Sequence, residues 1–171
     1  MNTLQRYTVK GIIFVLIIGT ISHFIYKWSG NNFIFGFFFP INESTWEHMK
    51  LCFFPMLFYS FYMNRKIRHD YPCISSALLS GILLSTFLVP VIFYTYSGIL
   101  GHNVLILDIA TFIASVLLAF AAVYKFSLSR RLVPYRRILQ LSVFTLAVCF
   151  FLFTYYPPDI GIFTDPVTIT D

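Results

Sequence analysis

The segment Pro40–Lys50, which reads PINESTWEHMK, gathers Glu43, Glu47, His48 and Lys50 into eleven residues. The chain as a whole is 58% hydrophobic and only 11% charged. Carboxylates and imidazoles are costly next to hydrocarbon, so a chain that keeps them there usually uses them. This segment is therefore the first place to look for a chemical site.

Part of the segment is explained by the start of a helix. The letters STWE at 44–47 fit a capping box, in which the Ser44 hydroxyl accepts from the amide of Glu47 and the Glu47 side chain reaches back. The preceding Glu43 would add negative charge at the helix N-terminus. Ser44 and Glu43 are thus predicted to be structural caps, whereas His48 is left without an explanation.

Two chemistries suit His48 if other polar side chains lie near it. His23, His48 and His102 could be ligands of Zn²⁺ or a similar ion, leaving a position for a water molecule that Glu47 or Asp108 would deprotonate as the catalytic base. Alternatively, an Asp–His pair could pass protons or bind a small polar ligand. The sequence has no HExxH, GxSxG, P-loop or glycine-rich dinucleotide motif that would choose between them.

The elements that must position these residues are membrane-spanning helices. With 20% aromatic residues, the chain has too few polar side chains to cover a water-soluble core. Five stretches are long enough to cross a hydrocarbon layer of ~30 Å at ~1.5 Å per residue. They are residues 11–27, 44–63, 74–97, 104–126 and 138–156. The predicted fold class is therefore all-α: a polytopic membrane protein, with one bundle of five transmembrane helices forming a single domain over residues 1–171.

The basic residues indicate an orientation. Ten of the twelve Lys and Arg residues fall within residues 6–10, 65–68 and 125–137, which five spans would bring to one side of the membrane. The positive-inside rule makes that side cytoplasmic, so the N-terminus is predicted inside and the C-terminus outside. The outer side then has an interfacial segment, 30–43, and a tail, 157–171, that could fold back over the mouth of the bundle.

This topology places the candidate residues in one layer. His23 lies four residues before the outer end of the first span, and Asp108 lies four residues after the start of the fourth. Both are expected about 6 Å inside the outer boundary, as is His48. His102 falls at the boundary itself. Equal depth does not show contact, because the helices could present these groups to different sides.

The composition also bears on partners and location. A net charge of +5 could suggest nucleic-acid binding, but the basic residues lie in short loops beside spans and have no nucleic-acid motif around them. Anionic lipid head groups are the more suitable partners for the cytoplasmic loops. The predicted location is the cell membrane, crossed several times, and the possible cofactor is zinc. The three cysteines have no CxxC spacing and indicate free thiols.

Two family resemblances carry different implications. The motif PxNESxWEHxK, the GHN before Asp108 and the terminal YPPDIGIFTDP resemble a family of small five-span bacterial integral membrane proteins of unknown function. That resemblance implies a bacterial inner membrane and no particular activity. Ser44-x3-His48 is similar to the Ser-x3-His element of the alkaline ceramidase and adiponectin-receptor superfamily of seven-span zinc hydrolases. This chain departs from that pattern, because no two of its histidines are four residues apart.

Two hypotheses of different classes follow. The first is an outward-facing His/carboxylate site that binds a metal ion or a small polar ligand and could hydrolyse a lipid or peptide with the help of the metal. The second is a non-catalytic small permease or subunit of a membrane complex, in which the NESTWE letters serve only as a helix cap. Whether the outer histidines and Asp108 converge is the observation that separates them.

Overall fold

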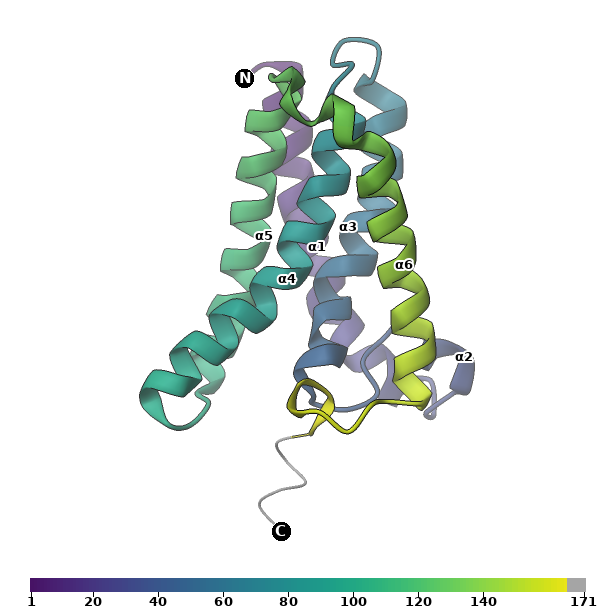
Figure 1. Ribbon diagram of the computed structural model, residues 1–171, viewed down its shortest axis with the longest axis vertical. Helices are drawn as coiled ribbons and strands as arrows, with labels where there is room; N and C mark the ends of the chain where they lie inside the picture. Colours follow the sequence, from purple (N-terminus) through teal and green to yellow (C-terminus); the bar gives the residue numbers. More distant parts are fainter. Residues whose placement is uncertain (166–171) are drawn as a thin grey trace.

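The computed structural model describes residues 1–165, so 166–171 of the predicted outer tail lie outside the described residues. The described chain is all-helical and contains no strand, which confirms the predicted all-α class (Figure 1). The α-helices are α1 (Thr3–Trp28), α2 (Phe33–Gly36), α3 (Thr45–Ile67), α4 (Ile74–Leu100), α5 (Leu105–Ser127) and α6 (Arg136–Tyr155). Two short 3₁₀ helices are η1 (Arg130–Tyr135) and η2 (Gly161–Phe163).

Within residues 1–165, four helical segments are long and apolar enough to cross a membrane: α1, α4, α5, and the run Arg130–Tyr155 that comprises η1 and α6. The fifth predicted span, α3, is not among them. Its side chains are largely buried against α1, α4 and α6, as the packing of Phe53 against Phe150 illustrates, with tilted rings whose centroids lie 5.1 Å apart. A helix enclosed by others does not need an apolar surface all round, because it is shielded from the surrounding solvent or lipid.

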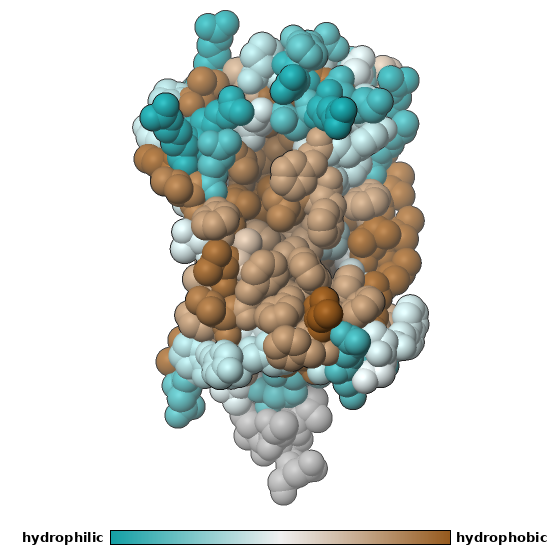
Figure 2. All heavy atoms as spheres, turned by 90° about the vertical axis from the view of Figure 1, so that its right-hand side faces the viewer, coloured by the Kyte–Doolittle hydropathy of each residue, from teal (hydrophilic) through white to brown (hydrophobic). Residues whose placement is uncertain are grey.

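The connections gather at two ends of the bundle. The N-terminus, the α3–α4 loop and η1 lie at one end, which we name the basic end because it holds the three clusters of Lys and Arg (Figure 1). The α1–α3 connection, the α4–α5 loop and η2 lie at the other, named here the site end. Figure 2 shows hydrophilic residues at both ends and a hydrophobic band between them. This banding is typical of proteins that cross a lipid bilayer.

Some helices begin or end outside the predicted spans, because capping residues determine where they begin and end. α1 begins at Thr3 and not at residue 11, because Asn2 and Gln5 form a capping box. α4 continues to Leu100 and ends at Gly101, whose φ of +77° is the left-handed conformation that glycine adopts without steric cost. The apolar runs therefore underestimate the helices, since polar first and last turns are helical as well.

The site end is less tightly closed than the basic end. Figure 1 shows the lower parts of α4 and α5 turning away from α3. Pro90 lies inside α4, where its missing amide hydrogen removes one helical hydrogen bond and favours a bend. Between α1, α3, α4 and α5 lies a cavity of about 590 Å³.

The described part of the outer tail folds back on the bundle. In η2, Phe163 packs against Trp46 in the first turn of α3, with ring centroids 4.8 Å apart. The amide of Glu43 donates to Asp165 across 3.2 Å. η2 and Asp165 therefore contact the chain at the N-terminus of α3.

Candidate functional site

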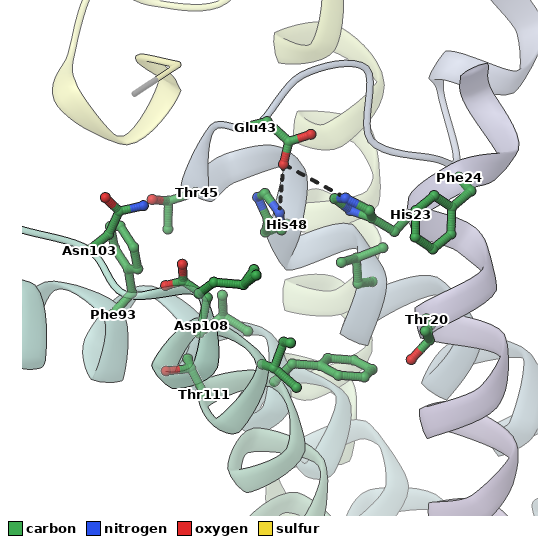
Figure 3. Close-up of a pocket in the computed structure, with 16 residues that line it drawn as sticks. Thr20, His23, Phe24, Glu43, Thr45, His48, Phe93, Asn103, Asp108 and Thr111 are labelled. Atoms are coloured by element: carbon green, nitrogen blue, oxygen red, sulfur yellow. Dashed lines mark ion pairs between the residues drawn. The ribbon is translucent and has the colours of Figure 1, made fainter. Parts of the chain in front are cut away.

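Three side chains from three segments meet at the mouth of the cavity. His23 comes from α1, His48 from the first turns of α3, and Glu43 from the connection just before α3 (Figure 3). Oε2 of Glu43 lies 3.4 Å from Nε2 of His48 and 3.8 Å from Nε2 of His23. The potential ligand atoms of the three residues all lie within 4.8 Å of one another, so they could share one metal ion.

Local structure orients the His48 ring toward Glu43. Nδ1 of His48 lies 2.9 Å from the carbonyl oxygen of Ser44, one helical turn earlier. A carbonyl only accepts, so Nδ1 carries the hydrogen and Nε2 faces the carboxylate. Backbone carbonyls commonly fix the tautomer of metal-binding histidines in this way. The ring of His23 lies beside that of His48, with centroids 5.3 Å apart.

The carboxylate of Glu43 is the negative centre of the cluster. The hydrogen bond from His48 is the main cause that holds the pKa of Glu43 below its ordinary value, and it outweighs the opposing effect of partial burial. Lys27 adds a positive group, with Nζ 3.8 Å from Oε1 of Glu43, but its side chain is 72% exposed. The cluster is therefore electrostatically satisfied when the imidazoles are protonated, or when a cation lies between them.

Asp108 lines the same cavity from α5 (Figure 3). Its Oδ1 accepts a hydrogen bond from the hydroxyl of Tyr96 on α4, so the α4–α5 hairpin holds its carboxylate in place. Asp108 is near enough to His48 to interact with it electrostatically, although it is not one of the three residues whose ligand atoms cluster. His23, His48 and Asp108, which were predicted to lie at one depth, thus line one cavity from two sides.

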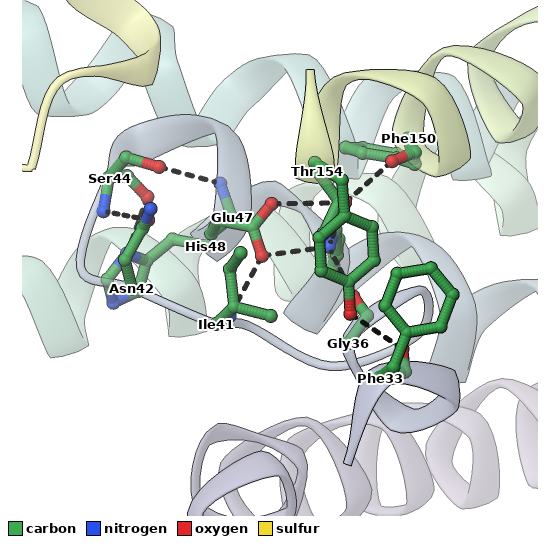
Figure 4. Close-up of polar contacts among 11 residues, drawn as sticks. Phe33, Gly36, Ile41, Asn42, Ser44, Glu47, His48, Phe150 and Thr154 are labelled. Carbon is green, nitrogen blue, oxygen red and sulfur yellow. Dashed lines mark hydrogen bonds and ion pairs between the residues drawn. The ribbon is translucent and has the colours of Figure 1, made fainter. Parts of the chain in front are cut away.

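Glu47 lies on another face of α3, outside the cavity. It forms a buried ion pair with Lys50, whose Nζ is 2.8 Å from Oε2 of Glu47 (Figure 4). Nζ also donates to the carbonyl of Gly36 at 2.9 Å and to Oγ1 of Thr154 at 2.6 Å, so its three hydrogens are all used. The amide of Ile41 donates to Oε2 of Glu47 at 2.9 Å. This network fastens the α2–α3 connection to α3 and α6.

The remaining predicted residues have different places. The Ser44 hydroxyl accepts from the amide of Glu47 at 3.4 Å, as one half of the predicted capping box requires. The other half is replaced, because the Glu47 carboxylate is bonded to Lys50 and the Ser44 amide donates to a neighbouring asparagine instead. Glu43 joins the histidines rather than the cap. His102 is exposed in the α4–α5 loop and is not part of the three-residue cluster.

Sequence reasoning placed Glu43 at the helix cap and gave no role to Lys50. Glu43 lies before the helix, where periodicity gives no direction for a side chain. Lys50 had a usable signal, because it follows Glu47 by three residues, a spacing at which opposite charges meet on a helix surface.

The fold and the cluster define the class: an all-helical protein with four helices able to span a membrane and a His/Glu/His cluster beside a cavity at one end. The chain belongs to a family of unknown function, DUF6512, whose family model matches residues 1–170. Neither a curated protein nor a solved structure matches the chain. The resemblance to a family of unknown function is confirmed at this level.

Proposed function

We propose that this protein crosses a cell membrane five times, as one transmembrane domain with the basic end in the cytoplasm and the site end outside. The basic residues support this orientation, because all three of their clusters gather at one end. α3 serves as the fifth span, which its position among the other helices makes possible despite its polar residues. The basic end would contact anionic lipid head groups, and the membrane would be a bacterial inner membrane.

We further propose that His23, Glu43 and His48 bind a divalent metal ion, with zinc the most suitable. One observation carries this proposal: donor atoms from three separate segments lie within 4.8 Å of one another. Two histidines and one glutamate form a ligand set found in catalytic zinc sites, which keep a fourth position for water. The carbonyl of Ser44 would act as the outer partner of the His48 ligand.

The reaction that this arrangement favours is hydrolysis of an ester or amide at the outer surface. A bound metal would acidify its water, and Asp108, which lines the same cavity and accepts a hydrogen bond from Tyr96, would receive the proton. The water oxygen would form the new bond to the carbonyl carbon. The bond to the leaving oxygen or nitrogen would break, and Asp108 would return the proton to that atom.

Metal analysis of the full chain tests the site. The protein, purified in detergent without a histidine tag, should contain zinc in a stoichiometric amount. His48→Ala and His23→Ala should lose it, because each removes one of three ligands. His102→Ala is the matched control, since it removes an exposed histidine from the same end of the molecule and should leave the metal content unchanged. Wild-type protein that neither contains a metal nor takes up added zinc would overturn the proposal.

A non-catalytic permease or complex subunit is the second candidate, and Lys27 is the observation that favours it. Its positive charge beside Glu43 suits a cluster of protonated histidines better than a divalent cation. In that case the cluster only ties α1 to α3, and Ser44 acts as a helix cap. This alternative predicts that added zinc leaves the melting temperature unchanged, whereas Glu43→Gln lowers it.

A further inference from the structure

The cavity beside the His/Glu/His cluster has two chemically different parts. Its mouth carries the cluster, and Asp108 and Asn103 lie on the α5 side (Figure 3). The remaining wall is mainly hydrocarbon and aromatic, contributed by α1, α3, α4 and α5. It includes Leu51, Val89, Phe93 and Phe112. A volume of about 590 Å³ falls within the range of small-molecule sites.

From this division we infer that the ligand of the site is an amphiphile with an acyl chain, whose chain occupies the apolar part while its polar group lies at the cluster. The inference rests on the proposed metal site and adds the class of substrate to it. Burial of an acyl chain against these walls is favourable by the area of hydrocarbon it removes from water.

A peptide or a polar solute fits this cavity less well. A peptide carries an amide donor and acceptor at each residue, and each one buried without a partner costs free energy. The apolar walls provide few hydrogen-bonding partners for these amide groups. The hydroxyl of Thr20, for example, already donates to the carbonyl of Leu16 across 2.8 Å. The charged groups of the cavity lie at its mouth, and the wall adds the hydroxyl of Thr111, which is buried without a hydrogen-bond partner among the described residues. Most of the hydrogen-bonding groups that a ligand needs are therefore at one end.

The cavity also reaches the side surface of the bundle between α1 and α5. Three of its lining residues are exposed on that surface: Phe24 by 44%, Leu105 by 75% and Ile109 by 52%. In the proposed topology this surface faces the outer leaflet of the bilayer. An acyl chain could therefore pass sideways from the lipid into the cavity without its polar group crossing the membrane.

Photolabelling of the full chain in phosphatidylcholine nanodiscs tests the inference. The probe is a palmitic-acid analogue with a diazirine in the middle of its chain, and peptide mass spectrometry locates the label. We expect label on Phe112 and its neighbours in the cavity wall, enriched about tenfold over the lipid-facing residues of α6, such as the exposed Phe144. Excess unlabelled palmitate should abolish the enrichment.

A pair of variants on α5 identifies the route. Ile109→Trp enlarges an exposed residue that lines the cavity and should reduce the cavity label about tenfold. Ile106→Trp enlarges an exposed residue of the same helix that does not line it and should leave the label unchanged. Because both positions are exposed, neither variant disturbs the core. Equal labelling of the two variants would refute entry between α1 and α5.

The experiment separates the failure of this inference from that of the metal site. Label spread evenly over α6 and the cavity wall, in protein that contains zinc, would overturn the acyl-chain inference and leave the metal proposal standing. Label confined to the cavity in protein that binds no zinc would overturn the metal proposal, while the acyl-chain site would remain.

Discussion

Replacement of Lys50 by methionine tests the buried network most directly. The Lys50 side chain is fully buried, and that of Glu47 is only 3% exposed, so their attraction is little screened by solvent. Lys50→Met keeps most of the side-chain volume and removes the charge. It leaves the Glu47 carboxylate without its cation, and it also removes the hydrogen bonds to Gly36 and Thr154.

The expected loss of stability is large for one substitution. Removing one partner of a buried ion pair costs about 3–5 kcal/mol, because the other charge stays buried and uncompensated. For a chain of this size each kcal/mol lowers the melting temperature by about 2–4 °C, which gives a decrease of roughly 6–20 °C. Glu47→Gln combined with Lys50→Met removes the unpaired charge. The double variant should therefore be more stable than the sum of the single effects by about 2 kcal/mol.

A buried cysteine can report the thermal unfolding of each variant. Cys52 is completely buried, so a thiol-reactive dye reports the unfolding of the bundle during a temperature ramp. Cys73 and Cys149, which are half-buried, are replaced by alanine in every variant to remove background. Lys27→Met is the matched control, because it removes an exposed lysine that is also paired with a glutamate. Exposed pairs contribute about 0–1 kcal/mol, and equal melting temperatures for Lys50→Met and Lys27→Met would refute the reasoning.

Three further predictions concern the rest of the site end. His48 favours the charged form of Glu43, so the pKa of Glu43 is lower in the folded protein than its ordinary value of 4.5. With a chelator present to exclude metal, the charged carboxylate therefore stabilises the fold above pH 4.5. This contribution should be lost as the pH falls through the lowered pKa. Melting temperatures between about pH 5 and pH 3 should thus fall less steeply for Glu43→Gln than for wild type. Ser44→Ala removes a helix cap and should cost about 1 kcal/mol in the same thermal assay; no change would argue against the cap. Gly19→Ala should cost about 1–3 kcal/mol, because its Cβ would meet a backbone carbonyl of α3 at 2.7 Å. Gly98→Ala, with open space around it, should be neutral or stabilising by up to about 1 kcal/mol.

The helical architecture was predictable because hydrocarbon leaves the backbone few alternatives. An apolar run of sufficient length must satisfy its amides internally, and each predicted run falls on a helix in the structure to within one residue at the ends where it extends beyond that helix. The helix ends were less predictable, because caps determine them. Asn2 and Gln5 begin α1 well before its apolar run, and Gly101 ends α4 after its own.

The sequence predicted how deep the candidate residues lie in the bundle, but not the direction in which their side chains point. His23 and His48 were expected in one layer, and the structure brings their rings together. Glu47 was expected to accompany His48. Adjacent residues of a helix point about 100° apart, however, so the two side chains face different neighbours. His102 lies near the same depth but in an exposed loop. Depth alone therefore does not determine which residues meet, because the direction in which each side chain points around the bundle axis matters as well.

Two polar clusters with different roles therefore meet at the first turns of α3: the Glu47–Lys50 network and the His/Glu/His cluster. The α2–α3 connection links them. Glu47 and Lys50 hold the α2–α3 connection at Ile41 and Gly36, from the side of α3 that faces α6. Glu43 follows Ile41 by only two residues, so the same bonds limit where its carboxylate can lie. A buried ion pair contributes little net stability compared with well-packed apolar residues. Its retention here is better explained by the loop geometry that it imposes, which brings a carboxylate to the histidines of α1 and α3.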